Sequence, residues 1–220
     1  MDVQLAIFDL DGVIVDTAKY HYLAWKRLSY ELGIEFTEQD NERLKGVSRM
    51  RSLDILLEIG HQEKTAQEKE NLATKKNRWY VEYILQMDAS QILPGVLDFL
   101  TELKAQGIKV ALGSASKNAR TILERIQLTD YFDAIIDGNL VSKAKPDPEV
   151  FLLGAQQLNI APEQTVVFED AKAGIEAGLN AGMITVGVGE PDVLSAAHLV
   201  IPGFQSLSAK ELLQALTEQL

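Results

Sequence analysis

The sequence contains no cysteine, which excludes disulfide bonds, thiolate metal sites and a cysteine nucleophile. It also lacks any apolar run close to the roughly 20 residues that a membrane-spanning helix needs. The N-terminus, Met1-Asp2-Val3-Gln4, has neither the basic start nor the long apolar stretch of a signal peptide. These absences predict a protein of the cytoplasm with no membrane partner.

Positive charge is also scarce. The chain has 21 Lys and Arg against 32 Asp and Glu, a net charge of −11, and this balance opposes binding to nucleic acid. If the substrate is a phosphate, a few placed Lys or Arg residues and a metal ion must supply positive charge locally. The 220 residues are 46% apolar, enough for the core of one large domain or of one domain that carries an insertion.

The first apolar run ends in a pair of acids. Residues 3–8 predict a buried strand, and Asp9 and Asp11 follow it, two residues apart. In an extended chain such residues point to the same side, at the strand end where open α/β sheets bind ligands. The pair could hold a divalent cation, or one acid could attack an electrophile while the other moves a proton. Alone, the motif is a weak signal and favours a turn at Asp11-Gly12 that Asp9 caps.

The second half of the chain alternates strands and helices. The expected strands cover 108–112, 134–136, 164–168, 184–188 and 198–201, and the expected helices cover 96–105, 118–126, 148–158, 171–181 and 208–219. Such alternation is typical of an α/β fold with a doubly wound parallel sheet.

Between the first and second strands lies a block that predicts only helices. Apolar residues recur at helical spacing over 21–32, 52–59 and 66–86, whereas a parallel crossover normally uses a single helix. We therefore expect a small helical cap domain, residues 16–87, inserted into a core formed by 1–15 and 88–220. The cap would cover Asp9 and Asp11.

Polar groups follow three further strands at the same predicted sheet edge. The turn 113–118 carries hydroxyls and backbone N–H groups that suit an anion, and Glu169-Asp170 ends the fourth strand. Between them, Pro146 holds Lys145 extended and Pro148 starts a helix, which predicts that a stiff loop presents the lysine. Each has an ordinary alternative: a helix N-cap, a solvated lysine and a second N-cap. Their convergence favours a phosphate site, with Mg²⁺ bound by oxygen ligands.

Taken together, these motifs resemble those of the haloacid dehalogenase superfamily of phosphotransferases. The resemblance rests on Asp9-Leu10-Asp11-Gly12-Val13, Ser114, Lys145 and Glu169-Asp170. It implies a Rossmann-like core, Mg²⁺ and an aspartyl-phosphate intermediate. Within the superfamily, the segments 16–25, 44–49, 75–77 and 114–119 resemble the β-phosphoglucomutases. The chain departs from that pattern at Met50-Arg51, where acidic residues are expected, and at Gly113, where alanine is usual.

The resemblance also assigns roles by position. Asp9 would be the nucleophile, and Asp11 the general acid/base. Mg²⁺ would be held by Asp9, the main-chain carbonyl of Asp11, Asp170 and, as an open question, Glu169. Ser114 and Lys145 would bind the transferring phosphate. The remaining substrate-binding residues would be Thr17, His21, Trp25, Lys45, Gly46, Val47, Arg49, Ser52, Lys76, Ala115, Ser116, Lys117 and Asn118, of which Arg49, Ser116, Lys117 and Asn118 would hold the stationary phosphate. His21 and Trp25 also fit ordinary packing on an apolar helix face.

The expected function is therefore interconversion of β-glucose 1-phosphate and glucose 6-phosphate, with β-glucose 1,6-bisphosphate as intermediate and activator. The alternative within enzymes is a Mg²⁺-dependent sugar-phosphate phosphatase on the same core. The alternative from another class is a non-catalytic phosphosugar-binding protein, which the intact acid pair disfavours. The expected partner is a small phosphosugar, and the expected state is a monomer.

Overall fold

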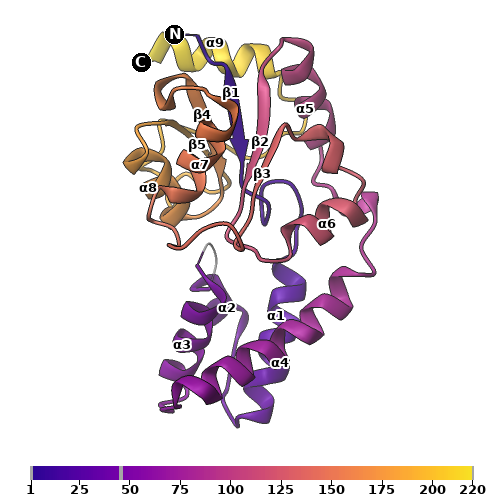
Figure 1. Ribbon diagram of the computed structural model, residues 1–220, viewed down its shortest axis with the longest axis vertical. Helices are drawn as coiled ribbons and strands as arrows, with labels where there is room; N and C mark the ends of the chain where they lie inside the picture. The colour runs from indigo at the N-terminus through magenta and orange to yellow at the C-terminus, as the bar shows by residue number, and fades with distance from the viewer. Residues whose placement is uncertain (1, 45–46, 220) are drawn as a thin grey trace.

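The computed structural model describes residues 2–44 and 47–219. Its core is a six-stranded parallel sheet with the strand order β3-β2-β1-β4-β5-β6 (Figure 1). The strands are β1 (Leu5–Phe8), β2 (Lys109–Gly113), β3 (Ala134–Ile136), β4 (Thr165–Glu169), β5 (Ile184–Val188) and β6 (Leu199–Ile201). The predicted doubly wound parallel fold is confirmed, and each strand end lies within two residues of its expected position.

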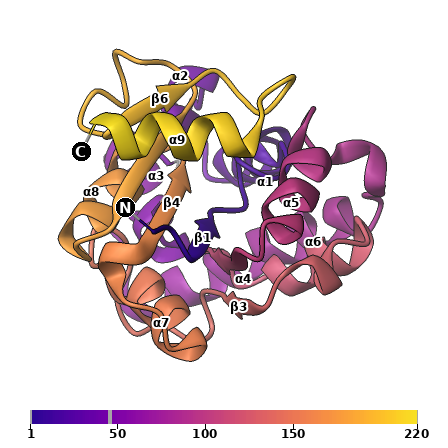
Figure 2. The same cartoon turned by 90° about the horizontal axis from the view of Figure 1, so that it is seen from above.

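Helices cover both faces of the sheet. One face carries α5 (Val96–Ala105), α6 (Ala119–Arg125) and α9 (Ala209–Gln219), and the other carries α7 (Glu149–Leu158) and α8 (Lys172–Asn180). Figure 2 shows α9 and α7 on opposite sides of the strands. Side chains of β1 alternate between the two layers: Ala6 and Phe8 pack with α5 and α9, Leu5 and Ile7 with α7 and α8.

Strand β1 occupies the position where the sheet order reverses. It pairs with β2 on one side and β4 on the other, so the chain winds first one way and then the other from this strand. All four residues of β1 are buried, and the Asp9 N–H continues the ladder by donating to the Phe168 carbonyl, 3.0 Å away. Ligands of open α/β sheets bind at this switch point, outside the carboxyl ends of the strands.

The helical block forms the predicted cap. It contains α1 (Ala18–Glu31), α2 (Glu38–Glu42), α3 (Arg49–Ile59) and α4 (Ala66–Ile84), and the described residues between 17 and 86 include no strand. In Figure 1 these helices lie beyond the carboxyl ends of the core strands. The two chain crossings between core and cap are adjacent, because Val15 forms a β-bridge with Ile92 and Leu93 N–H donates to the Ile14 carbonyl. The boundaries 16 and 87 themselves stay a prediction.

Two cap helices differ from the expected ranges. Helix α2 was not expected, because five residues are too few to show a period. A capping box between Thr37 and Asp40 starts it. Helix α3 begins at Arg49 rather than Ser52, since Ser48 Oγ accepts a hydrogen bond from Arg51 N–H and caps the helix one turn earlier. Arg49 therefore lies in the first turn of a helix and not in a loop.

Three short 3-10 helices, Ala89–Gln91, Thr129–Tyr131 and Pro162–Gln164, were also not expected. Within the described ranges, no helix has both the length and the apolarity required to cross a bilayer.

Candidate active site

A cavity of about 520 Å³ lies between the carboxyl edge of the sheet and the cap. Most of the residues predicted to form the site line it: Asp9, Asp11, Thr17, His21, Trp25, Val47, Arg49, Ser52, Lys76, Ala115, Ser116, Lys117, Asn118 and Asp170. Ser114, Lys145 and Glu169 are buried and do not line it. Lys45 and Gly46 lie outside the described residues. The fold thus brings core and cap positions that are far apart in the sequence, from Asp9 to Asp170, into one chamber.

Beneath this cavity, Lys145 joins three neighbouring strands. Its Nζ donates to Asp9 Oδ1 at 2.6 Å, to Glu169 Oε1 at 2.6 Å and to the Gly113 carbonyl at 3.0 Å. Burial alone would lower the pKa of Lys145, but the two carboxylates outweigh it and raise that pKa. The lysine is therefore charged, and it fixes the Asp9 carboxylate at the tip of β1.

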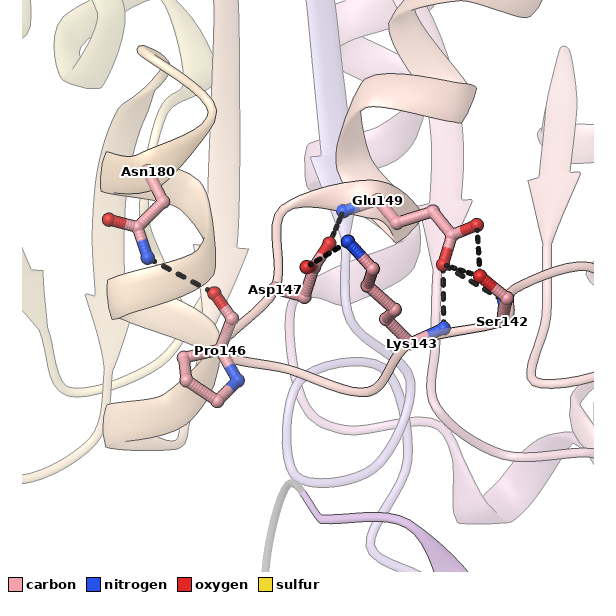
Figure 3. A network of polar contacts seen from close by, with 6 residues as sticks. All are labelled: Ser142, Lys143, Pro146, Asp147, Glu149 and Asn180. Atoms are coloured by element: carbon pink, nitrogen blue, oxygen red, sulfur yellow. Dashed lines mark hydrogen bonds and ion pairs between the residues drawn. The ribbon is translucent and has the colours of Figure 1, made fainter.

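The loop that presents Lys145 is locked by its own polar contacts (Figure 3). Glu149 accepts hydrogen bonds from the backbone N–H groups of Ser142 and Lys143, at 2.9 and 2.7 Å. Asp147 pairs with the Lys143 ammonium at 3.1 Å, and Asn180 of α8 donates to the Pro146 carbonyl at 3.1 Å. The Lys145–Pro146 peptide bond is cis. Contacts on both sides of Lys145 thus hold its loop in place, in agreement with the stiff loop that the sequence predicts.

The second acid of the pair has a different environment. Asp11 accepts a hydrogen bond from Oγ1 of Thr17, the residue that precedes the first cap helix. Burial and the neighbouring Asp9 carboxylate raise the pKa of Asp11 to about 7, although Thr17 and the charges of Lys145 and Lys76 act to lower it. A carboxyl group with a pKa near neutrality can both accept and return a proton.

The carboxylate of Asp170 reaches the same loop. A Cβ added to Gly12 would lie 2.1 Å from Asp170 Oδ2, and Gly12 has a φ of +84°, so only glycine fits here. Asp9, Asp11 and Asp170 together bring three acids to one end of the cavity.

These acids fit Mg²⁺. In the described part of the chain no group of three or more His, Cys, Asp or Glu side chains forms a metal site by itself. Mg²⁺, however, is usually held by one or two carboxylates that are completed by substrate phosphate and water. Glu169 differs from the other acids, because its Oε1 accepts from Lys145 and its Oε2 accepts from Ala171 N–H at 2.8 Å.

The turn after β2 is ordered by successive side-chain caps. Ser114 Oγ accepts from Ser116 N–H at 3.1 Å, and Ser116 Oγ accepts from Asn118 N–H at 3.2 Å. Gly113, where the resemblance leads one to expect alanine, has a packing reason: an added Cβ would lie 2.8 Å from Phe151 Cδ1. Ser116 and the exposed Lys117 therefore line the cavity from a braced turn, whereas Ser114 is buried.

On the cap side, Lys76 of α4 is almost fully buried among aromatic rings. Its Nζ lies 3.0 Å from His21 Nδ1 and over the rings of Trp25 and Tyr80, at 4.5 and 4.7 Å. Burial, together with the charge of Arg49, lowers the pKa of Lys76 well below its usual value. Burial and the Lys76 charge lower that of His21 in the same way. His21 and Trp25 therefore pack in the cap and also line the cavity, so the two interpretations of them are compatible.

Of the two residues that depart from the β-phosphoglucomutase pattern, Met50 and Arg51, only one lines the cavity. Arg51 pairs with Glu58 at 2.7 Å on the outer side of α3 and does not line the cavity, whereas Met50 does. Arg49 faces inward, and burial lowers its pKa while the charge of Glu70 opposes that shift. The added cation of Arg51 is thus turned away from the substrate space.

Several cavity residues were missed by sequence reasoning. They include Asn41, Ser48, Glu70, Asn77 and Lys143. Asn77 makes a contact between the cap and the core, because its Oδ1 accepts from Asn118 Nδ2 at 2.9 Å. The helical period contained the signal for two of these residues: once Lys76 is placed in the cavity, positions 70, 73 and 77 fall on the same face of α4.

The chain is similar to known proteins over most of its length. Residues 6–188 match the model of the haloacid dehalogenase-like hydrolases. The chain is 44% identical to β-phosphoglucomutase of Bacillus subtilis over 201 residues, 90% of this chain and 89% of the relative. The crystal structure of β-phosphoglucomutase from Clostridium difficile superposes with a TM-score of 0.94 at 42% identity, covering 98% of each chain. A phosphorylated-carbohydrate phosphatase of Thermotoga maritima is 34% identical, covering 82% of each chain.

Proposed function

The chain belongs to the haloacid dehalogenase-like hydrolase family, and from that membership we propose that it is a β-phosphoglucomutase. It would interconvert β-D-glucose 1-phosphate and D-glucose 6-phosphate. The observation that carries this proposal is that one cavity is lined both by the acid pair of the core and by the buried Lys76 of the cap. The two β-phosphoglucomutases that the chain resembles over nearly their full length support it.

The two acids would divide the reaction. A phosphoryl group on Asp9 passes to a sugar hydroxyl: the new P–O bond forms to the sugar oxygen, the P–O bond to Asp9 breaks, and Asp11 takes the hydroxyl proton. The resulting β-glucose 1,6-bisphosphate reorients, so that its other phosphate faces Asp9, and it gives that phosphoryl group back to Asp9. Asp11, whose pKa lies at about 7, returns the proton to the leaving sugar oxygen.

Mg²⁺ would be held by Asp9, the main-chain carbonyl of Asp11 and Asp170. When bound, it supplies positive charge that reduces repulsion between the phosphate and the Asp9 carboxylate. Glu169 acts through Lys145, since both of its oxygens already accept hydrogen bonds. Lys145 in turn orients the Asp9 carboxylate and, with Ser114, contributes to binding of the transferring phosphate.

The remaining polar residues would hold the rest of the substrate. Arg49, Ser116, Lys117 and Asn118 line the cavity and would hold the stationary phosphate. His21, Trp25, Val47, Ser52 and Lys76 would line the sugar, and Thr17 would link the first cap helix to Asp11. A closed cap must exclude water, because water in place of the sugar hydroxyl would hydrolyse phospho-Asp9.

A coupled assay tests this function. Each anomer of glucose 1-phosphate is supplied separately with Mg²⁺ and a trace of β-glucose 1,6-bisphosphate, and glucose 6-phosphate is measured. We expect product from the β-anomer alone, none with Asp9→Asn, and a strongly reduced rate with Asp11→Asn. Wild-type rates in Asp9→Asn would refute the aspartyl-phosphate mechanism.

A sugar-phosphate phosphatase is the second candidate. It is supported by the Thermotoga maritima relative, which is described as a phosphatase of phosphorylated carbohydrates. Release of inorganic phosphate without glucose 6-phosphate in the same assay would favour it over the mutase. Binding of sugar phosphate without either product would instead indicate a non-catalytic binding protein.

We also propose the cytoplasm as the location and a monomer as the working state, with a small phosphosugar as the partner. The net charge of −11 supports the expected lack of nucleic-acid binding. Gel filtration with light scattering would test the oligomeric state.

A further inference from the structure

One side-chain hydrogen bond joins the cap to the phosphate-binding turn directly. Asn77 Oδ1 on α4 accepts from Asn118 Nδ2, at the start of α6, over 2.9 Å. Both side chains are half-buried and line the cavity. Figure 1 shows α4 passing close to α6, where the cap meets the core. The bond therefore joins the cap to the core and does not stay within one domain.

On the core side, this bond extends the chain of contacts that braces the phosphate-binding turn. Ser114 Oγ accepts from Ser116 N–H, and Ser116 Oγ accepts from Asn118 N–H. The Asn118 side chain then donates to Asn77. A displacement of α4 is thus transmitted to the turn through hydrogen bonds of ordinary length.

On the cap side, Asn77 directly follows the buried Lys76. That lysine contacts His21 Nδ1 at 3.0 Å and its charge acts on Asp11. Helix α4 therefore carries, in consecutive residues, a contact to the phosphate-binding turn and a charge that acts on the proton-transferring acid. Closing the cap would engage both at once.

The chemistry of the amides gives the contact a direction. A carbamoyl group has one acceptor oxygen and two N–H donors. Because Asn77 Oδ1 accepts from Asn118 Nδ2, the amide nitrogen of Asn118 is turned toward Asn77, and its second N–H can donate to a phosphate oxygen in the cavity that both residues line. A phosphate oxygen needs a donor, so the reverse orientation of Asn118 would present a repelling carbonyl.

We propose that Asn77 is a positioning residue that latches the closed cap and orients the Asn118 amide toward the stationary phosphate. The proposal rests on the proposed function, because it takes the phosphosugar as the ligand. It separates Asn77 from Lys76: the lysine acts toward the acid pair, whereas the asparagine acts through Asn118.

The test compares Asn77→Ala with Asn71→Ala, another asparagine of α4 that is exposed and does not line the cavity. Three quantities are measured: KM and kcat for β-glucose 1-phosphate, the ratio of inorganic phosphate to glucose 6-phosphate formed, and the Kd of glucose 6-phosphate from tryptophan fluorescence. In Asn77→Ala we expect KM and Kd to rise about three- to tenfold, the effect of one lost hydrogen bond. We also expect a raised phosphate ratio, and no change in Asn71→Ala.

A double variant distinguishes positioning from general support of the fold. If Asn77 acts through Asn118, Asn77→Ala raises KM less than about twofold in an Asn118→Ala background, because the two effects are not additive. Multiplying effects, or a lower kcat with unchanged KM and phosphate ratio, would overturn the proposal.

Hydrogen–deuterium exchange supplies a readout that needs no turnover. Exchange at residues 115–118 should rise in Asn77→Ala and stay unchanged in Asn71→Ala. If the wild-type protein forms no glucose 6-phosphate, the proposed function fails, but the exchange result still decides the latch. If mutase activity is present and Asn77→Ala changes neither exchange nor KM, the latch fails and the function stands.

Discussion

At the scale of single residues, the arrangement around Lys145 explains how a buried charge can be tolerated. Its ammonium group is paired with two carboxylates and a carbonyl from β1, β2 and β4, so every donor has a partner. Removing one member of a buried ion pair typically costs about 3–5 kcal/mol, since the other charge is left unpaired. Asp9, Lys145 and Glu169 therefore act as one unit.

Gly174 of α8 makes room for that unit. A Cβ at this position would fall 1.8 Å from Glu169 Oε1, in a site where the glutamate is fully buried. We expect Gly174→Ala to displace Glu169 and with it Lys145, to destabilise the fold by about 1–3 kcal/mol and to lower the mutase rate. Urea denaturation and the coupled assay measure both effects.

Gly154 of α7 is the matched control. It is also a buried helical glycine, but the nearest atom to an added Cβ would be Ile7 Cδ1, at 3.2 Å, which is the end of a flexible side chain, and the next, Ile136 Cγ1, is at an ordinary contact distance of 3.8 Å. Gly154→Ala should keep its activity. Equal losses in the two variants would mean that the Glu169 contact has no special role.

Lys76 illustrates a conflict between stability and function. Burial lowers its pKa well below the usual value, and His21 and two aromatic rings form its immediate surroundings. We expect Lys76→Met to stabilise the protein, because the variant removes the cost of burying a charge. Turnover should fall at the same time, because the cation that acts on Asp11 is lost.

Lys75→Met provides the comparison for that variant. Lys75 is its neighbour on α4 but is exposed and pairs with Glu31 at the surface. Its replacement should change stability and turnover little. Denaturant midpoints and kcat are the measurements, and a destabilised Lys76→Met would contradict the prediction.

At the scale of elements, the N-terminus of the last helix, α9, is capped by an acidic side chain from another helix. Glu102 of α5 accepts hydrogen bonds from Ser208 Oγ, Ala209 N–H and Lys210 N–H, at 2.9, 2.8 and 3.2 Å. These bonds, led by the one from Ala209, lower the pKa of Glu102. A lowered pKa in the folded state means that the stabilisation is present above the unfolded pKa and is lost as the pH falls through the folded value.

Glu102→Gln should therefore lower the melting temperature at pH 7, and the gap to wild type should shrink below about pH 4.5. Melting curves from pH 7 to pH 3 measure this. Glu124→Gln, at an exposed position of α6, should change the melting temperature at pH 7 little. A gap for Glu102→Gln that is independent of pH would show that the charge has no part in capping α9.

At the scale of the whole molecule, negative charge is concentrated where a cation is required. The chain carries a net charge of −11, and Asp9, Asp11 and Asp170 meet at one end of the cavity. We expect Mg²⁺ to bind there and to stabilise the protein by about 1.4 kcal/mol at ten times its Kd, which raises the melting temperature by a few degrees. A chelator should remove both this shift and the activity.

Asp170→Asn should abolish the shift with Mg²⁺, whereas Asp98→Asn, at an exposed position of α5, should retain it. Thermal melts with and without Mg²⁺ make the comparison. An undiminished shift in Asp170→Asn would place the metal elsewhere.

The order of strands and helices and the insertion of a helical cap could be predicted from the sequence. The reason is that both depend on local period: buried runs predict the strands, and the long stretch without such runs predicts the cap. The candidate acids at Asp9, Asp11, Glu169 and Asp170 could be predicted as well, because each follows a buried strand. Helix α2 and the start of α3 could not be predicted, since a cap contact rather than periodicity sets them.

Contacts between the cap and the core were decided only by the tertiary structure. The sequence determined that Lys145 is presented from a stiff loop. It did not determine that the two carboxylate oxygens of Glu169 accept hydrogen bonds from Lys145 and Ala171. Nor did it determine that Asn77 meets Asn118, 41 residues along the chain. Local sequence sets the hydrophobic period and the caps of each helix and strand. Contacts across the cavity depend instead on how the cap and the core are placed against each other.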